Sequence, residues 1–285
     1  MGPCCQLRDC DSGPFAAIAG VAAFEIVGHV AALLTMVGAG LWVVSRSLHR
    51  LHHLHHLHHL TNDRDPPVNP TAPFDTLIFD LDGTLSDSAP GIVASLNHAY
   101  DRLGHPKPAS FQHFIGPPFE TIFRSEGFSP DEIITLLAVY RERYWDIGAF
   151  ENSIYPGIED VLDQLAAQGY RIAIATSKPE ATALRILEHF GYIDRFEVIG
   201  GATFDMRRAT KSAVLSYVLD QLGETRPVMI GDRYHDVEGA AEHGIDCIGV
   251  RWGYGVGDEL QRCGARWIID EPAQIMDIVH GEVLL

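Results

Sequence analysis

Lysine is scarce in this sequence, and acidic residues outnumber basic ones over the chain as a whole. The 285 residues include only Lys107, Lys178 and Lys211, and 21 basic residues face 38 acidic ones for a formal net charge of −17. Residues 1–60 are balanced, so the whole excess falls on residues 61–285. A surface that binds nucleic acid needs clustered Lys and Arg. We therefore expect no nucleic-acid partner and a small anionic substrate, held by a local positive group and a metal.

Paired cysteines and the common nucleotide-binding motifs are also absent from the sequence. The five cysteines form no Cys-x-x-Cys pair, and three of them lie within the first ten residues. This is no disulfide framework, so we expect reduced, intracellular chemistry. The chain has neither a Gly-x-x-x-x-Gly-Lys-Ser/Thr loop nor a His-Arg-Asp catalytic loop. A kinase built on this sequence would therefore be unconventional.

Residues 1–72 differ in composition from the rest of the chain. Phe15–Val44 is almost entirely apolar, which is long enough for the roughly 20 residues that cross a bilayer as a helix. Arg46 and Arg50 follow at once, which favours a cytoplasmic position for what comes after them. We predict a membrane anchor through residues 15–44, with a cytoplasmic catalytic domain at the inner face of the cell membrane. The alternative is a misassigned start codon, with this segment never translated.

A histidine and leucine repeat covers residues 49–60, and a proline-containing stretch follows at residues 61–73. Leucine every third residue drifts around a helix, so the repeat forms no stable apolar face. It is either a spacer or a run of imidazoles that binds transition metals such as Zn²⁺, Ni²⁺ or Cu²⁺. The stretch after it is typical of an extended linker, so the folded part begins near Phe74.

Short apolar runs alternate with amphipathic helical patterns beyond the linker. We predict strands at residues 77–79, 171–176, 196–199, 227–230, 245–250 and 267–269, with helices such as 181–190 and 211–222 between them. This order predicts an α/β fold with a parallel sheet covered by helices. The connection from 85 to 169 is too long for one crossover, and its helical patterns at 92–103 and 130–144 predict a separate cap. The predicted domains are residues 1–72, a core of 73–87 with 170–285, and a cap of 88–169.

Polar side chains follow three of the predicted strands, where parallel sheets bind their ligands. Asp80 and Asp82 follow the first strand, Thr176, Ser177 and Lys178 follow the second, and Asp232 and Asp236 follow the strand at 227–230. Four carboxylates at one sheet edge need a cation, and hard oxygen ligands suit Mg²⁺. We predict Asp80, Asp82, Asp232 and Asp236 as the metal-binding set.

The same residues suit phosphoryl transfer. Asp80 is placed to be a carboxylate nucleophile, and Asp82 to protonate the leaving oxygen and then activate water. Gly83 permits the tight turn between the strand and the following residues. Thr176, Ser177 and Lys211 are the predicted phosphate-binding residues, and Lys178 is an alternative to Lys211.

These residues stand in four motifs that resemble those of the haloacid dehalogenase (HAD)-like hydrolase superfamily. Phe79-Asp80-Leu81-Asp82-Gly83-Thr84-Leu85 is similar to motif I, Ala175-Thr176-Ser177-Lys178 to motif II, Lys211 to the motif III lysine, and Gly231–Asp236 to motif IV. All four in order are far more specific than one alone. The resemblance covers roughly residues 74–270. It implies a Rossmann-like core, a type-1 helical cap, and a member close to the phosphoglycolate phosphatases, similar also to an actinobacterial protein tyrosine kinase of this type.

Three kinds of function stay open on this basis. The leading one is a Mg²⁺-dependent phosphatase that hydrolyses a small phosphomonoester, phosphoglycolate-like, through an aspartyl-phosphate. The second is a phosphotransferase, either a protein tyrosine kinase or a sugar phosphomutase, that uses the same aspartate. The third is a membrane-tethered binding module that uses the fold as a scaffold, against which the complete set of acids argues.

Overall fold

The computed structural model describes residues 72–116, 119–203 and 207–281. The predicted membrane span at 15–44, the histidine repeat at 49–60 and most of the proline-containing linker lie outside the described residues. Within the described ranges, no helix is long and apolar enough to cross a membrane.

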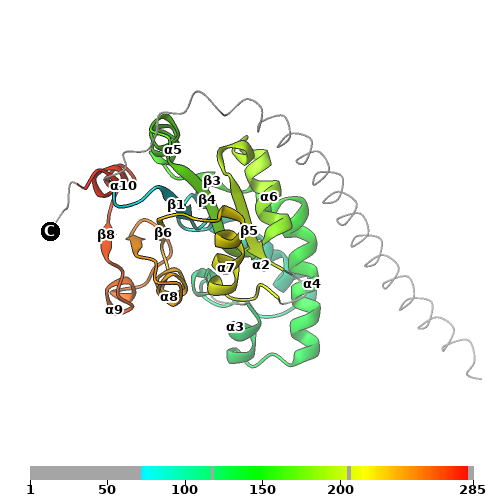
Figure 1. The fold of residues 1–285 in the computed structure, drawn as a ribbon. Coiled ribbons are helices and arrows are strands. Elements are labelled where there is room, and N and C mark those ends of the chain that lie inside the picture. Colours follow the sequence, from blue (N-terminus) through cyan, green and yellow to red (C-terminus); the bar gives the residue numbers. More distant parts are fainter. Residues whose placement is uncertain (1–71, 117–118, 204–206, 282–285) are drawn as a thin grey trace, which may run out of the picture. The chain divides into compact units, whose positions relative to one another are not determined.

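A six-stranded parallel sheet lies at the centre of the fold (Figure 1). Its spatial order is β5-β4-β1-β6-β7-β8. The strands are β1 (Thr76–Phe79), β4 (Arg171–Pro179), β5 (Val198–Ala202), β6 (Pro227–Gly231), β7 (Cys247–Val250) and β8 (Trp267–Ile269). The predicted parallel sheet with its covering helices is thereby confirmed.

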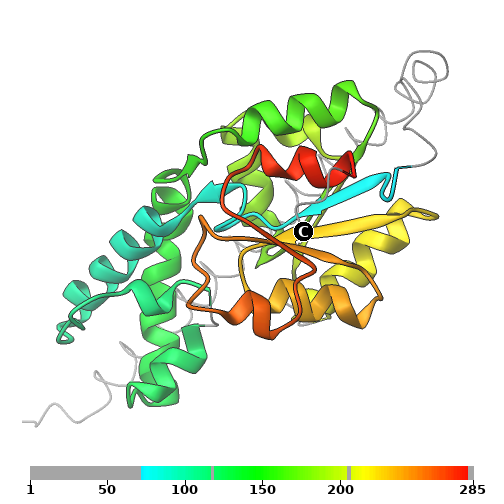
Figure 2. The same cartoon turned by 90° about the vertical axis from the view of Figure 1, so that its left-hand side faces the viewer.

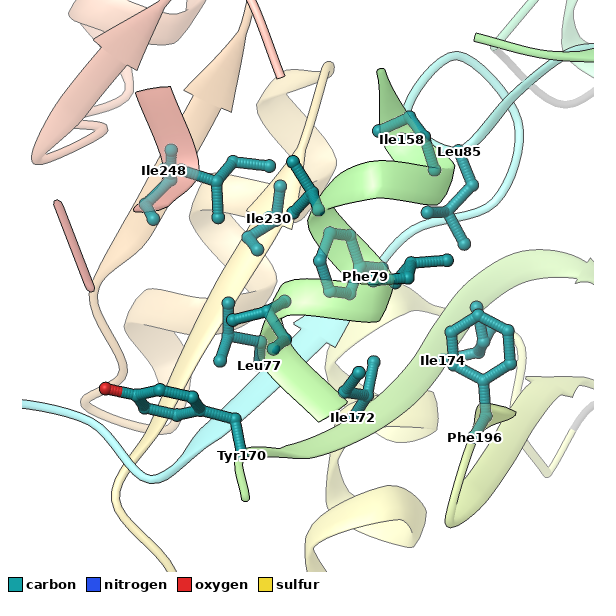
Figure 3. Packing of buried hydrophobic residues seen from close by; sticks show 14 of the residues in the cluster. Leu77, Phe79, Leu85, Ile158, Tyr170, Ile172, Ile174, Phe196, Ile230 and Ile248 are labelled. Atoms are coloured by element: carbon teal, nitrogen blue, oxygen red, sulfur yellow. The ribbon is translucent and has the colours of Figure 1, made fainter. Parts of the chain in front are cut away.

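Alternating side chains of the strands enter two different apolar layers, as the period of two in a strand requires. Leu77 and Phe79 of β1 pack in one cluster, and Ile78 between them packs in another. The first cluster (Figure 3) is completed by α5 (Ile158–Ala167), α6 (Glu180–His189) and α10 (Gln274–Val279). The second is completed by α7 (Lys211–Leu222), α8 (Tyr234–Glu242) and α9 (Glu259–Arg262). Helices therefore cover both faces of the sheet.

A third apolar cluster belongs to the helical insert between β1 and β4. It is built by α2 (Ala89–Leu103), α3 (Phe119–Ser125) and α4 (Pro130–Asp146), with 3₁₀ turns at Gln112–Phe114 and Gly148–Phe150. Figure 2 shows these helices, in cyan and green, grouped beside the sheet. Ser129 begins α4 with a capping box, in which its hydroxyl accepts from the Glu132 N–H and Glu132 accepts from the Ser129 N–H. We call this insert the cap.

Two short strands join the cap to the core. β2 (Ser86–Asp87) and β3 (Ser153–Ile154) pair antiparallel, so both connections run side by side. The predicted cap of 88–169 includes α5, but the structure packs Ile158 and Leu162 of α5 in the sheet cluster with Phe79. An amphipathic helix pattern does not reveal which layer its apolar face meets, and the apolar face of α5 meets the sheet.

We expect Phe79→Ala to lower the free energy of unfolding by about 3–5 kcal/mol, because Phe79 is fully buried directly before Asp80. Urea unfolding measures the change. Ile134→Ala is the matched control, since Ile134 is 67% exposed and its loss should change stability by less than about 0.5 kcal/mol. Equal effects of the two variants would contradict the assigned core.

Candidate active site

Three neighbouring strands bring the predicted site residues to one edge of the sheet. Asp80 follows β1, which lies between β4 and β6. Thr176 lies on β4, and Asp232 follows β6. The Asp80 N–H donates to the carbonyl of Ile230 at 2.9 Å, which continues the β1–β6 ladder up to the site. Parallel pairing therefore fixes the spacing of residues that lie far apart in the sequence.

Asp80, Asp232 and Asp236 form a buried carboxylate cluster. One oxygen from each lies within 4.8 Å of the others, and Asp232 and Asp236 are completely buried. The Lys211 ammonium pairs with Asp80 at 3.0 Å and Asp236 at 2.7 Å, and also donates to the carbonyl of Ala175 at 2.9 Å. Lys211 is thus the cation of the cluster, as its predicted position in the motif set implies.

Local structure delivers Lys211 to this position. It is the first residue of α7, whose N-cap Thr210 accepts a hydrogen bond from the Ala213 N–H at 3.2 Å. Its stem runs past Gly239 of α8, where a Cβ would lie 2.8 Å from Lys211 Cγ. A side chain at 239 would therefore push the ammonium away from the carboxylates.

The protonation equilibria of the cluster report an excess of negative charge. Burial raises the pKa of Asp80 to about 6, a shift that Lys211 opposes and Asp236 reinforces. Burial, together with Asp236 and Asp80, also raises the pKa of Asp232 well above its usual value. Burial by itself lowers the pKa of Lys211, but Asp236 and Asp80 more than offset this and hold it above its ordinary value. Three carboxylates against one ammonium fit a divalent cation, and their hard oxygens suit Mg²⁺.

The turn after β1 is built around Gly83. Its φ of +84° lies in the left-handed region, and its N–H donates to the carbonyl of Ser86 at 2.8 Å. A Cβ at this position would lie 2.3 Å from Asp232 Oδ2. Thr84 donates from its hydroxyl to the other oxygen of Asp232 at 3.2 Å. The turn is therefore pressed against the carboxylate that it helps to hold.

Asp82 does not join the carboxylate cluster. Its carboxylate instead pairs with the ammonium of Lys178, which lies over the ring of Tyr144 in the cap at 5.1 Å from the ring centre. Burial alone lowers the pKa of Lys178, but Asp82 and Tyr144 more than restore it, so that it lies above its ordinary value. Of the four acids predicted as metal ligands, the structure gathers three, and the fourth side chain faces the cap.

Thr176 and Ser177 occupy different environments although they are adjacent. Thr176 is buried, and its hydroxyl accepts from the Lys178 N–H at 3.2 Å. Its side chain also helps to hold the Asp80 carboxylate. Ser177 is exposed. The structure therefore places Thr176 with Asp80 and directs Lys178, predicted as an alternative to Lys211, to Asp82 instead.

The loop after β7 contacts Asp232 and the turn around Gly83, although none of the predicted site residues lies in this loop. The Tyr254 N–H donates to Asp232 Oδ2 at 2.7 Å, and the Trp252 indole donates to the carbonyl of Thr84 at 3.1 Å. Gly253 lies so close that a Cβ would be 2.2 Å from the carbonyl oxygen of Gly83. The hydroxyl of Tyr254 donates to Asp87 at 2.8 Å, at the entrance to the cap. The glycines flanking Tyr254 were the available signal for this close approach.

Arg233 adjoins the site as well, although it is not among the predicted site residues. Only 11% of its side chain is exposed. It pairs with Glu259 at 2.7 Å and donates to the carbonyl of Ile115 in the cap at 3.1 Å. A Cβ at Gly116 would lie 1.6 Å from the Arg233 guanidinium. Arg233 therefore ties the loop of the acid cluster to the cap.

Comparison with known proteins supplies the family. A protein-family model described as haloacid dehalogenase-like hydrolase matches residues 77–250 of this chain. The chain belongs to the haloacid dehalogenase-like hydrolase family. This confirms the predicted resemblance and, with it, the prediction of an enzyme of the HAD-like family.

Three relatives illustrate the range of named activities within the HAD-like family. PtkA of Mycobacterium tuberculosis, named a tyrosine-protein kinase, is 46% identical over 193 residues, 65% of this chain and 65% of that protein. Its solved structure matches with a TM-score of 0.65 at 41% identity, covering 73% of this chain and 99% of that one. A 5′-nucleotidase of Pseudomonas aeruginosa is 39% identical over 193 residues, 66% of this chain and 87% of that protein. A phosphoglycolate phosphatase of Aliivibrio fischeri is 31% identical over 210 residues, which are 68% of this chain and 92% of that protein. The chain covers less than two thirds of the kinase's length.

We expect the metal-free protein to gain stability from Asp80 at low pH and to lose it as the pH rises. The folded-state pKa of about 6 lies above the ordinary 3.8, so folding favours the protonated acid. The stabilisation from Asp80 is complete when the pH is below the ordinary pKa of 3.8, and it disappears as the pH rises through the folded-state pKa of about 6. The melting temperature of wild type minus that of Asp80→Asn, measured in chelator, should fall across this range. Mg²⁺ at neutral pH should then raise the wild-type melting temperature. A difference independent of pH would contradict this account.

Proposed function

We propose that this protein is a magnesium-dependent phosphatase that hydrolyses a small phosphomonoester through an aspartyl-phosphate on Asp80. The observation that carries the proposal is the position of Asp80 beside the Lys211 ammonium and two further buried carboxylates. Asp80, Asp232 and Asp236 are the side chains that would hold Mg²⁺. When bound, the ion would neutralise negative charge on the phosphoryl oxygens and on the cluster.

The chemistry at the residues divides into two steps. In the first, a carboxylate oxygen of Asp80 forms a bond to phosphorus, the ester P–O bond breaks, and the leaving oxygen takes a proton from Asp82. In the second, Asp82 takes a proton from water, whose oxygen attacks phosphorus and releases inorganic phosphate from Asp80. Thr176 and Lys211 hold the phosphoryl oxygens in both steps. Their burial beside Asp80 supports this role.

The cap supports a small substrate. The phenol of Tyr144 and the guanidinium contact of Arg233 join the cap to the core on the site side. A cap of this kind encloses a small ester and excludes bulk water from the reaction. The phosphoglycolate phosphatase among the relatives supports a phosphoglycolate-like substrate, and the 5′-nucleotidase supplies the next candidate to be tried.

We expect Mg²⁺-dependent phosphate release from at least one member of a panel of phosphoglycolate, 5′-nucleotides, sugar phosphates and p-nitrophenyl phosphate. Asp80→Asn should lower kcat by about a thousandfold or more, because the nucleophile is lost. Asp101→Asn is the matched control, since Asp101 lies at the exposed end of α2 and pairs only weakly with Lys107 in solvent. Absence of release from every ester would sink the phosphatase proposal.

A phosphotransferase is the second candidate, and the kinase relative favours it. In this case the phosphoryl group moves from Asp80 to a tyrosine hydroxyl instead of water. The full chain incubated with γ-labelled ATP and a tyrosine-containing protein should then label that protein, and Asp80→Asn should not. Label that appears only as free phosphate would reject transfer and support hydrolysis.

A further inference from the structure

The wall of the cap that faces Asp82 carries a hydroxyl group whose proton has no acceptor. Tyr144 of α4 is 7% exposed, and its buried hydroxyl donates to none of the residues that the structure describes, while the Lys178 ammonium, which can only donate, lies next to it. Burial raises the pKa of this hydroxyl, so it remains a proton donor at neutral pH. A buried donor without an acceptor is unusual in a folded protein and calls for an explanation.

The Tyr144 ring is held firmly by other aromatic side chains. It stacks on Tyr140 with ring centres 5.3 Å apart and planes at 13°. Phe119 packs edge-on against Tyr140 at 4.8 Å. Offset stacking and edge-to-face contacts of this kind fix ring orientation. The hydroxyl is therefore a rigid feature of the cap and not a freely moving surface group.

The Lys178 ammonium lies beside this hydroxyl. Its side chain is 6% exposed, and its position over the Tyr144 ring brings a permanent positive charge to the same place. An ammonium has three N–H donors, and the contact with Asp82 uses one of them. The second oxygen of Asp82, Oδ1, is also buried without a hydrogen-bond partner among the described residues.

These groups lie on the leaving-group side of the proposed reaction. The phosphoryl group is assigned to Asp80, Thr176 and Lys211, whereas Asp82 serves the leaving oxygen. Lys178 contacts Asp82 directly, and Tyr144 comes from the cap above it. Any acceptor that Lys178 and Tyr144 bind must therefore be only a few bonds away from the ester oxygen.

We propose that Tyr144 and Lys178 form a subsite for a carboxylate carried by the leaving group, close to the ester oxygen. The inference rests on the proposed phosphatase function and names its substrate class, the phosphate esters of short hydroxy acids. A fixed cation and a neutral O–H donor side by side match the two oxygens of a carboxylate. Tyr144 is a specificity residue in this scheme, because it selects the leaving group and takes no part in the bond changes.

The test compares two esters with two carbons each, 2-phosphoglycolate and ethyl phosphate, on the full chain with Mg²⁺. Tyr144→Phe should raise KM for phosphoglycolate about tenfold, equal to about 1.4 kcal/mol, with little change in kcat. KM for ethyl phosphate should stay as in wild type, since ethyl phosphate has no carboxylate for Tyr144 to bind. Tyr100→Phe is the matched control: Tyr100 is a buried cap tyrosine whose hydroxyl donates to Glu126 at 2.9 Å, and it should leave both KM values unchanged.

Calorimetric binding of 2-phosphoglycolate to wild type and Tyr144→Phe separates this inference from the proposed reaction. If 2-phosphoglycolate binds to wild type about tenfold more tightly than to Tyr144→Phe, the subsite is supported even when no ester is hydrolysed. In that case only the phosphatase proposal fails. An equal effect of Tyr144→Phe on both esters, or no effect on either, overturns the subsite. So does a failure of wild type to bind phosphoglycolate, or a preference for 2-hydroxyethyl phosphate that depends on Tyr144.

Discussion

The contact of the Lys211 ammonium with Asp80 and Asp236 is the interaction on which the rest of the site depends. Burying carboxylates at one sheet edge is costly unless a cation and hydrogen bonds compensate them. Lys211 supplies one positive charge, and backbone and hydroxyl donors supply further stabilisation to Asp232. The remaining negative charge appears as the raised pKa of Asp80 and of Asp232. The folded cluster therefore carries uncompensated negative charge, which a divalent cation would neutralise.

Close backbone approach is the second requirement of the cluster. Glycines stand at two points where backbone passes directly against an acid: a Cβ at Gly231 would lie 2.2 Å from the Asp236 carboxyl carbon, and one at Gly253 would lie 2.4 Å from Asp232 Cβ. These glycines come from different segments, Gly231 from the end of β6 and Gly253 from the loop after β7, yet they adjoin the same carboxylate cluster. The site is therefore assembled by packing of backbone against side chain, and this packing leaves little freedom for the acids to move apart.

The cap and the core meet through polar contacts that lead back to the same acids. Arg233 follows Asp232 and reaches Ile115 in the cap, while Tyr254 joins Asp232 to the start of the cap at Asp87. These contacts consequently link the position of the cap to the loops that hold the cluster. On the other side of the site, Tyr144 and Lys178 bring a cap group and a core group together. In the proposed reaction, this arrangement would divide substrate choice and chemistry between the cap and the core.

The sequence by itself determined the parallel sheet and the order of its strands along the chain, and it proposed Asp80, Thr176, Lys211, Asp232 and Asp236 as site residues, because apolar periodicity and residues at strand ends are local signals. Helix α7 was predicted with the bounds that the structure has, whereas the packing of α5 against the sheet is visible only in the structure. Only the tertiary structure decided that Asp82 faces Lys178, that Ser177 is exposed, and that Tyr144, Arg233 and Tyr254 adjoin the site. Those facts depend on contacts between residues far apart in the chain, and no local pattern encodes which distant side chain will lie opposite.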